Sequence, residues 1–195
     1  MPTPDNSLFR GKTVRLSCLQ KEDAPTIARW TEDGEYLRFQ DTGIARPLTA
    51  DGVEADMERD ADSETTFSFG IRRIEDDALI GTIGLFDVEW GNRTAWIGVG
   101  LGHRGDWGKG YGSEAMRLIL RYAFDELNLH RVQLTVIAYN SRAVAMYEKL
   151  GFVREGAYRE FVDRDGARHD LLLYGLLRHE WRDKKRGGRS GEGER

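Results

Sequence analysis

A glycine-rich turn, Trp107-Gly108-Lys109-Gly110-Tyr111-Gly112, constrains the fold of this chain more than any other segment. It joins an apolar run over residues 94–101 to a stretch of helical periodicity over residues 110–127. The alternate glycines leave the backbone bare where the first N–H groups of a helix have no partner within the helix. The turn therefore predicts a strand, a turn and a helix whose N-terminus can hold a phosphate group.

The rest of the chain alternates between strand and helix patterns. Further strands are expected over residues 12–19, 66–74, 78–88, 132–138, 152–162 and 169–177. Helices are expected from Lys21, from Thr49 and from Asn140, and the last of these ends at Gly151. We therefore predict an α/β fold with about seven strands and four helices in a single domain, residues 1–182. Residues 183–195, rich in charge and glycine, are expected to form a disordered tail.

Composition and charge narrow the class of protein. The chain has 195 residues, of which 39% are hydrophobic and 32% charged, with a formal net charge of −4. These values are ordinary for a soluble domain, and the acidic body argues against a nucleic-acid partner. No apolar run approaches the roughly 20 residues of a membrane span, and the first residues lack a signal-peptide pattern. We expect a cytoplasmic protein with no membrane partner.

The single cysteine and the histidines give little sign of catalysis. Cys18 alternates with Val14 and Leu16, so it is expected to be a small buried residue rather than a reactive thiol. The histidines lack the spacing of metal ligands, and no metal is expected; they are His103, His130, His169 and His179.

The glycine turn has three other interpretations besides a phosphate cradle. A P-loop requires a hydroxyl residue directly after Gly-Lys, but Gly110 follows Lys109. A dinucleotide fingerprint requires Gly-x-Gly-x-x-Gly, whereas the spacing here is Gly-x-Gly-x-Gly, and no acidic residue ends the next strand. A loop with incidental glycines remains open, because a glycine cluster alone is weak evidence.

The strand before the turn adds a second feature. Gly98, Gly100 and Gly102 occupy its end, where glycine commonly marks a bulge or a close approach of a ligand to the backbone. Such a strand would separate from its parallel neighbour at 132–138 and leave main-chain groups free for a peptide-like ligand. Amide partners beside a phosphate cradle suit coenzyme A, which carries both pantetheine amides and a pyrophosphate.

On these segments the sequence resembles the GNAT superfamily of N-acetyltransferases, nearest to the branch that acetylates N-terminal alanine and serine of ribosomal proteins. The resemblance extends from about Lys12 to Trp181 and rests on four segments in order. They are Asn92-Arg93-Thr94-Ala95, Trp107 through Ala115, Leu129-His130-Arg131-Val132, and Asn140 through Phe152. The resemblance implies a mixed, mostly antiparallel, V-shaped sheet and acetyl-CoA as the acetyl donor.

The resemblance also implies roles for individual residues. Val99, Gly100 and Leu101 would pair with pantetheine, and the turn Trp107, Gly108, Lys109, Gly110, Tyr111 and Gly112 would cradle the pyrophosphate. Asn140 would bind the coenzyme, although helix capping alone also explains it. Tyr147 would lie near the thioester sulfur and act as the general acid, since a phenol with a pKa of about 10 matches a leaving thiolate. Simple packing is the alternative for Tyr147.

Two departures from the family bear on catalysis. Trp107 stands where many relatives have glutamine or arginine, which a backbone cradle tolerates. Trp96 stands where many relatives have a glutamate that draws the proton from the amine, so Asp87 and Glu89 are the nearest candidates for a base. No nucleophile suggests a covalent intermediate, and direct transfer in a ternary complex is expected. A non-catalytic acyl-CoA sensor is the alternative function.

The acceptor is expected to be a primary amine on a small molecule or on a protein N-terminus. The helix after Thr49 is strongly acidic and could attract a cationic acceptor, but it could equally be a solvated face. Four aromatic residues are candidates for an acceptor pocket, with core packing as the alternative. The family resemblance also implies a possible homodimer. The acidic residues are Asp51, Glu54, Asp56, Glu58, Asp60, Asp62 and Glu64, and the aromatic residues are Trp30, Tyr36, Phe39 and Trp96.

Overall fold

A seven-stranded sheet forms the centre of the protein, with strand order β1-β2-β3-β4-β5-β7-β6. The computed structural model describes residues 8–182, so the predicted tail at 183–195 lies outside the described residues. Every neighbouring pair of strands is antiparallel except β4 and β5. The predicted mixed, mostly antiparallel sheet is confirmed. The strands are β1 (Val14–Ser17), β2 (Phe67–Arg73), β3 (Leu79–Glu89), β4 (Thr94–Leu101), β5 (Arg131–Ile137), β6 (Val153–Arg164) and β7 (Ala167–Leu177).

The helices are more numerous than predicted. Helix α2 was missed, as was a helical segment over residues 178–182 after β7. The Asp33 carboxylate caps α2 by accepting the N–H groups of Glu35 and Tyr36. None of the described helices is long and apolar enough to cross a membrane. The α-helices are α1 (Ala24–Trp30), α2 (Gly34–Gln40), α3 (Ala50–Ala61), α4 (Tyr111–Arg121) and α5 (Ser141–Leu150).

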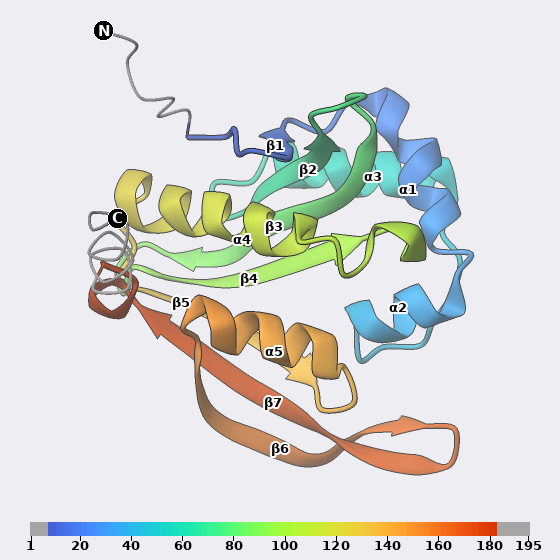
Figure 1. Ribbon diagram of the computed structural model, residues 1–195. Coiled ribbons are helices and arrows are strands. Elements are labelled where there is room, and N and C mark those ends of the chain that lie inside the picture. The colour runs from blue at the N-terminus through green and yellow to red at the C-terminus, as the bar shows by residue number, and fades with distance from the viewer. Residues whose placement is uncertain (1–7, 183–195) are drawn as a thin grey trace, which may run out of the picture.

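Helix α4 packs across the sheet and supplies much of the core (Figure 1). Its apolar residues Met116, Ile119 and Leu120 are fully buried, as its periodicity predicts. On the polar side, the Glu114 carboxylate accepts hydrogen bonds at the start of β1, including one of 3.0 Å from the N–H of Thr13. A π-helical turn over residues 122–126 completes the predicted helix. The glycine turn is thus anchored to the core from its C-terminal side.

The two arms of the sheet separate after a short parallel seam. Strands β4 and β5 pair only from Thr94 with Arg131 to Trp96 with Gln133. Beyond this point the arms diverge toward the side where α2 lies (Figure 1). The predicted separation is confirmed, but the predicted bulge in β4 is wrong: the register shift lies in β3, between Phe86 and Glu89.

Gly100 at the end of β4 and Gly102 directly after the strand allow side chains of α2 and α1 to pack closely. A Cβ atom on Gly102 would lie 2.0 Å from the Trp30 ring, and one on Gly100 would lie 2.6 Å from the Gln40 side chain. The Trp30 indole is only 2% exposed, so the ring has no free space to move into. The close approach predicted from the glycines therefore belongs, at these two positions, to the protein itself.

The expected burial of Cys18 is wrong. Strand β1 ends at Ser17, and the cysteine lies beyond the alternating pattern that buries Val14 and Leu16. Its thiol is free and exposed.

Candidate active site

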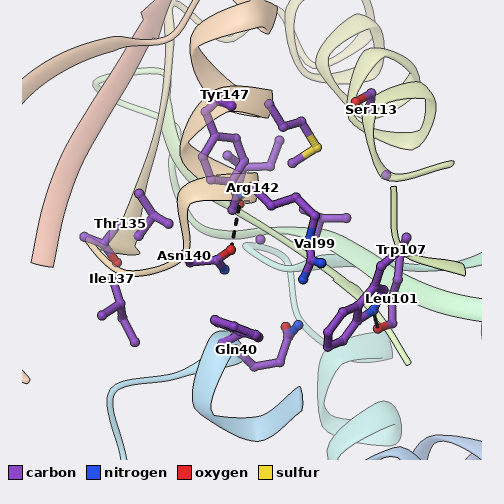
Figure 2. A pocket seen from close by; sticks show the side chains of 18 of the residues that line it. Gln40, Val99, Leu101, Trp107, Ser113, Thr135, Ile137, Asn140, Arg142 and Tyr147 are labelled. Carbon is purple, nitrogen blue, oxygen red and sulfur yellow. Dashed lines mark hydrogen bonds between the residues drawn. The ribbon is translucent and has the colours of Figure 1, made fainter. Parts of the chain in front are cut away.

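A cavity of about 640 Å³ lies between the two arms of the sheet. One wall is the part of β4 that has no partner on its β5 side, including Val99 and Leu101, and the other is the end of β5, including Thr135 and Ile137. Figure 2 shows these residues around one space with Gln40 from α2 and Tyr147 from α5. The volume falls within the usual range for small-molecule sites.

The glycine turn forms one end of the cavity. Gly108 and Gly110 have φ angles of +78° and +90°, which favour glycine, and no atom lies within 4 Å of a Cβ built on either. The turn directly follows Asp106, a buried residue whose carboxylate accepts a 3.1 Å hydrogen bond from Arg73 on β2. This bond ties the start of the turn to the sheet. An open, bare backbone before the N-terminus of α4 fits a phosphate group.

Helix α5 brings Asn140 and Tyr147 to the same cavity. The Asn140 side chain caps the helix by accepting the N–H of Ala143 at 3.2 Å, and the residue also lines the cavity. Burial raises the pKa of Tyr147 to about 12, which is higher than the value expected from the sequence. The phenol is therefore protonated at neutral pH, and it packs against Phe152 at 5.8 Å between ring centroids. Asn140 therefore both caps α5 and lines the cavity, and Tyr147 both packs against Phe152 and lines the cavity.

Trp107 changes how β4 can receive a ligand. Its indole N–H donates a 2.8 Å hydrogen bond to the carbonyl oxygen of Leu101, so this acceptor is already engaged. The Arg142 guanidinium lies 4.3 Å from the centre of the Trp107 ring, a cation–π contact. Val99 is thus better placed than Leu101 to pair its carbonyl with a ligand, contrary to the equal roles expected from the sequence.

Not every predicted residue lines the cavity. Val99, Leu101, Trp107, Gly108, Gly110, Gly112, Asn140 and Tyr147 line it. Gly100, Lys109 and Tyr111 do not: Gly100 faces Gln40, the Lys109 amine lies 3.8 Å from the Asp106 carboxylate, and Tyr111 packs against the core.

The candidates for base and acceptor pocket mostly lie elsewhere. Asp87 and Glu89 are exposed and do not line the cavity, and Glu89 accepts a hydrogen bond from Asn92. Of the four aromatic residues considered, only Phe39 lines the cavity, whereas Trp30 and Tyr36 are buried in a separate cluster. None of the acidic residues of α3 lines it, because that helix packs against α1 and β2.

Several lining residues were not anticipated, chiefly because α2 was missed. The signal for α2 was the pair Asp33 and Gly34 followed by Glu35, a short capped helix. Arg142 could also have been noticed from the sequence. It is a cation in the first turn of α5, where the helix dipole disfavours a positive charge, and that turn contains no acidic residue. The unanticipated residues include Gln40, Asp41, Thr42, Thr135, Ile137, Arg142 and Phe161.

The cavity fits an acyl-CoA donor. The bare turn at 108–110 suits a pyrophosphate, the unpaired edge of β4 at Val99 suits a pantetheine amide, and the basic side chains of Arg142 and Lys149 line the same space. Within residues 8–182, no group of three or more histidine, cysteine or acidic residues is arranged to hold a metal ion.

Comparison with known proteins agrees with this geometry. The family model described as "Acetyltransferase (GNAT) domain" matches residues 13–153. The "Probable N-acetyltransferase YjcK" of Bacillus subtilis is 32% identical over 178 residues, covering 87% of this chain and 97% of that protein. The alanine N-acetyltransferase of ribosomal protein uS5 from Escherichia coli is 26% identical over 118 residues, covering 60% of each chain.

Solved structures share the fold. The crystal structure of spermidine N-acetyltransferase from Vibrio cholerae in complex with CoA and spermine has a TM-score of 0.79 at 23% identity, covering 88% of this chain and 99% of that one. At this identity the likeness concerns the fold alone. The family match and the identity to curated relatives carry the assignment: the chain belongs to the GNAT family of N-acetyltransferases.

Proposed function

We propose that the protein transfers an acetyl group from acetyl-CoA to a primary amine by direct attack within a ternary complex. One observation carries the proposal: a single cavity joins the bare glycine turn, the unpaired edge of β4 and the Tyr147 side chain. The acceptor is a small-molecule amine or a protein N-terminus.

The residues of the chain act mainly by orientation. The N–H groups around Gly108, Gly110 and Gly112 would hold the pyrophosphate, and Val99 would hold the pantetheine amide. The amine nitrogen attacks the thioester carbonyl carbon, the new C–N bond forms, and the C–S bond breaks. Tyr147, protonated at neutral pH, gives its proton to the departing thiolate sulfur.

The attacking amine must also lose a proton. Neither Asp87 nor Glu89 lines the cavity, and Trp96 cannot accept a proton. We therefore assign this step to solvent, which takes the proton from the amine and later returns one to the tyrosinate. The net reaction is acetyl-CoA plus amine giving amide plus coenzyme A.

Calorimetry with acetyl-CoA tests donor binding, and thiol release across a panel of amines tests turnover. Binding with turnover of at least one amine supports the enzyme, whereas binding without turnover of any amine favours the sensor. Failure to bind acetyl-CoA would refute both. A Tyr147→Phe variant should bind the donor as the wild type does but lose about 10²-fold or more in kcat, because general acid catalysis typically contributes 10²–10⁴-fold. Full turnover by this variant would remove the proposed acid alone.

A further inference from the structure

A carboxylate also lies in the lining of the cavity. Asp41 is the only acidic residue among the described residues that line the cavity, whereas the basic residues Arg142 and Lys149 come from α5. If the phosphates of the donor engage these basic residues in addition to the glycine turn, Asp41 is the charged lining residue left to face the acceptor.

The Asp41 side chain is held in one orientation. Its Oδ1 atom accepts the N–H groups of Thr42 at 2.5 Å and Gly43 at 3.2 Å, which forms an Asx turn at the C-terminus of α2. Its Oδ2 atom accepts no hydrogen bond from any residue in the range 8–182 that the structure describes. One oxygen builds the turn, and the other remains available to a ligand.

The tip of the β6–β7 hairpin is hydrogen-bonded to this turn. Arg164 donates from Nη2 to three successive main-chain carbonyl oxygens, those of Asp41, Thr42 and Gly43, at 3.4, 3.1 and 2.7 Å. The neighbouring Asp165 binds Arg38 of α2 through two hydrogen bonds of 2.8 and 2.9 Å. The Arg164 side chain therefore positions Asp41 through the backbone rather than by an ion pair with its carboxylate.

An exposed aromatic ring from the same hairpin lines the cavity as well. Phe161 is 54% exposed and lies within the β6 bulge between Tyr158 and Val162. Glu160 adopts a φ of +53° there, and its N–H donates to the Asp170 carboxylate at 2.9 Å. A carboxylate and an aromatic face both bind an organic ammonium ion favourably.

From this placement we infer that Asp41, aided by Phe161 and positioned by Arg164, binds a second cationic group of the acceptor, so that the preferred substrate class is small aliphatic diamines. The inference rests on the proposed N-acetyltransferase function of the same cavity. One amine of the diamine is acetylated at the donor end, and the other remains protonated and binds Asp41. A peptide N-terminus followed by a basic residue offers the same charge and is the competing source.

The test compares each member of a series of α,ω-diamines with the amino alcohol of equal chain length, by thiol release from acetyl-CoA. The wild type should prefer the best diamine by about tenfold in kcat/KM, the effect of one hydrogen bond between charged groups. Asp41→Asn keeps the oxygen that forms the turn and should lose the preference through KM, with kcat nearly unchanged. Asp87→Asn makes the same chemical change outside the cavity and should keep it.

Arg164→Gln should reduce the same preference, and its effect should not add to that of Asp41→Asn, because both act through one contact. Equal use of the diamine and the amino alcohol by the wild type, or an unchanged preference in Asp41→Asn, would overturn the inference. Turnover of basic peptides without turnover of any diamine would overturn it in favour of a protein acceptor. The proposed function fails separately, by absence of acetyl-CoA binding.

Discussion

Replacing Gly102 by alanine should destabilise the protein strongly, because the new methyl group would overlap a buried ring. The Cβ atom would lie 2.0 Å from Cδ2 and 2.1 Å from Cε2 of Trp30. Carbon atoms normally approach to about 3.5–4.0 Å, so the ring would have to move by more than 1 Å. Trp30 is 2% exposed, and its indole N–H is bound to His103 at 3.3 Å. We expect a loss of about 3 kcal/mol, the upper part of the range for overpacked cores.

Guanidinium denaturation followed by circular dichroism would measure this loss, and thermal melts should show a Tm lower by about 6–12 °C for a domain of this size. Gly100→Ala, two residues earlier at the end of β4, is the matched control. Its Cβ would meet the end of the flexible Gln40 side chain at 2.6 Å, which can turn away. The control should cost less than about 1 kcal/mol. A Gly102→Ala variant within about 0.5 kcal/mol of the wild type would refute the packing described for Trp30.

Three further predictions concern the cavity. Gly110→Ala should lower the free energy of unfolding by about 1–2 kcal/mol because the φ of +90° disfavours a side chain, and calorimetry should show weaker acetyl-CoA binding. The control Gly105→Ala, in open space without a positive φ, should change neither the stability nor the binding. Asn140→Ala should lower the free energy of unfolding, measured in urea, by about 1 kcal/mol, and Asn140→Ser should recover it because serine also caps a helix. Weak donor binding in both variants would show that Asn140 has a separate ligand role, and unchanged binding would exclude that role. Burial raises the pKa of Tyr147 to about 12 from about 10 in the unfolded chain, so its contribution to stability is present below pH 10 and is lost as the pH rises through 12. Burial raises the pKa of Tyr36 to about 12 as well, so tyrosinate absorbance should show two phenols that titrate at high pH, of which Tyr147→Phe removes one. A pKa near 10 for the Tyr147 phenol would contradict its burial.

Local signals in the sequence predicted most of the fold. Thr49 and Asn140 cap α3 and α5, Gly151 ends α5 with a φ of +103°, and β4 has the predicted bounds. These features depend on residues close together in the chain, where capping and alternation leave clear patterns. Helix α2 was missed because its seven residues are too few for a periodic pattern.

The cavity was predicted less completely than the fold, because its composition depends on contacts between distant segments. The turn that begins at Asp41 is bound by Arg164, which lies far away in the sequence, and no local pattern links the two. The role of Trp107 likewise depends on the Leu101 carbonyl and on Arg142. The acidic residues of α3 formed the more visible pattern, but they lie on a helix that the cavity does not reach.

The short parallel seam between β4 and β5 links the stability of this protein to its surroundings. Only three residue pairs, the last being Trp96 with Gln133, join the two arms of the sheet at that seam. A donor that occupies the gap would supply contacts that the polypeptide itself omits. A ligand that binds only the folded chain adds about 2.7 kcal/mol at a concentration one hundred times its Kd. The abundance of the folded protein in a cell would then follow the local supply of acetyl donor, independently of how fast any acceptor is modified.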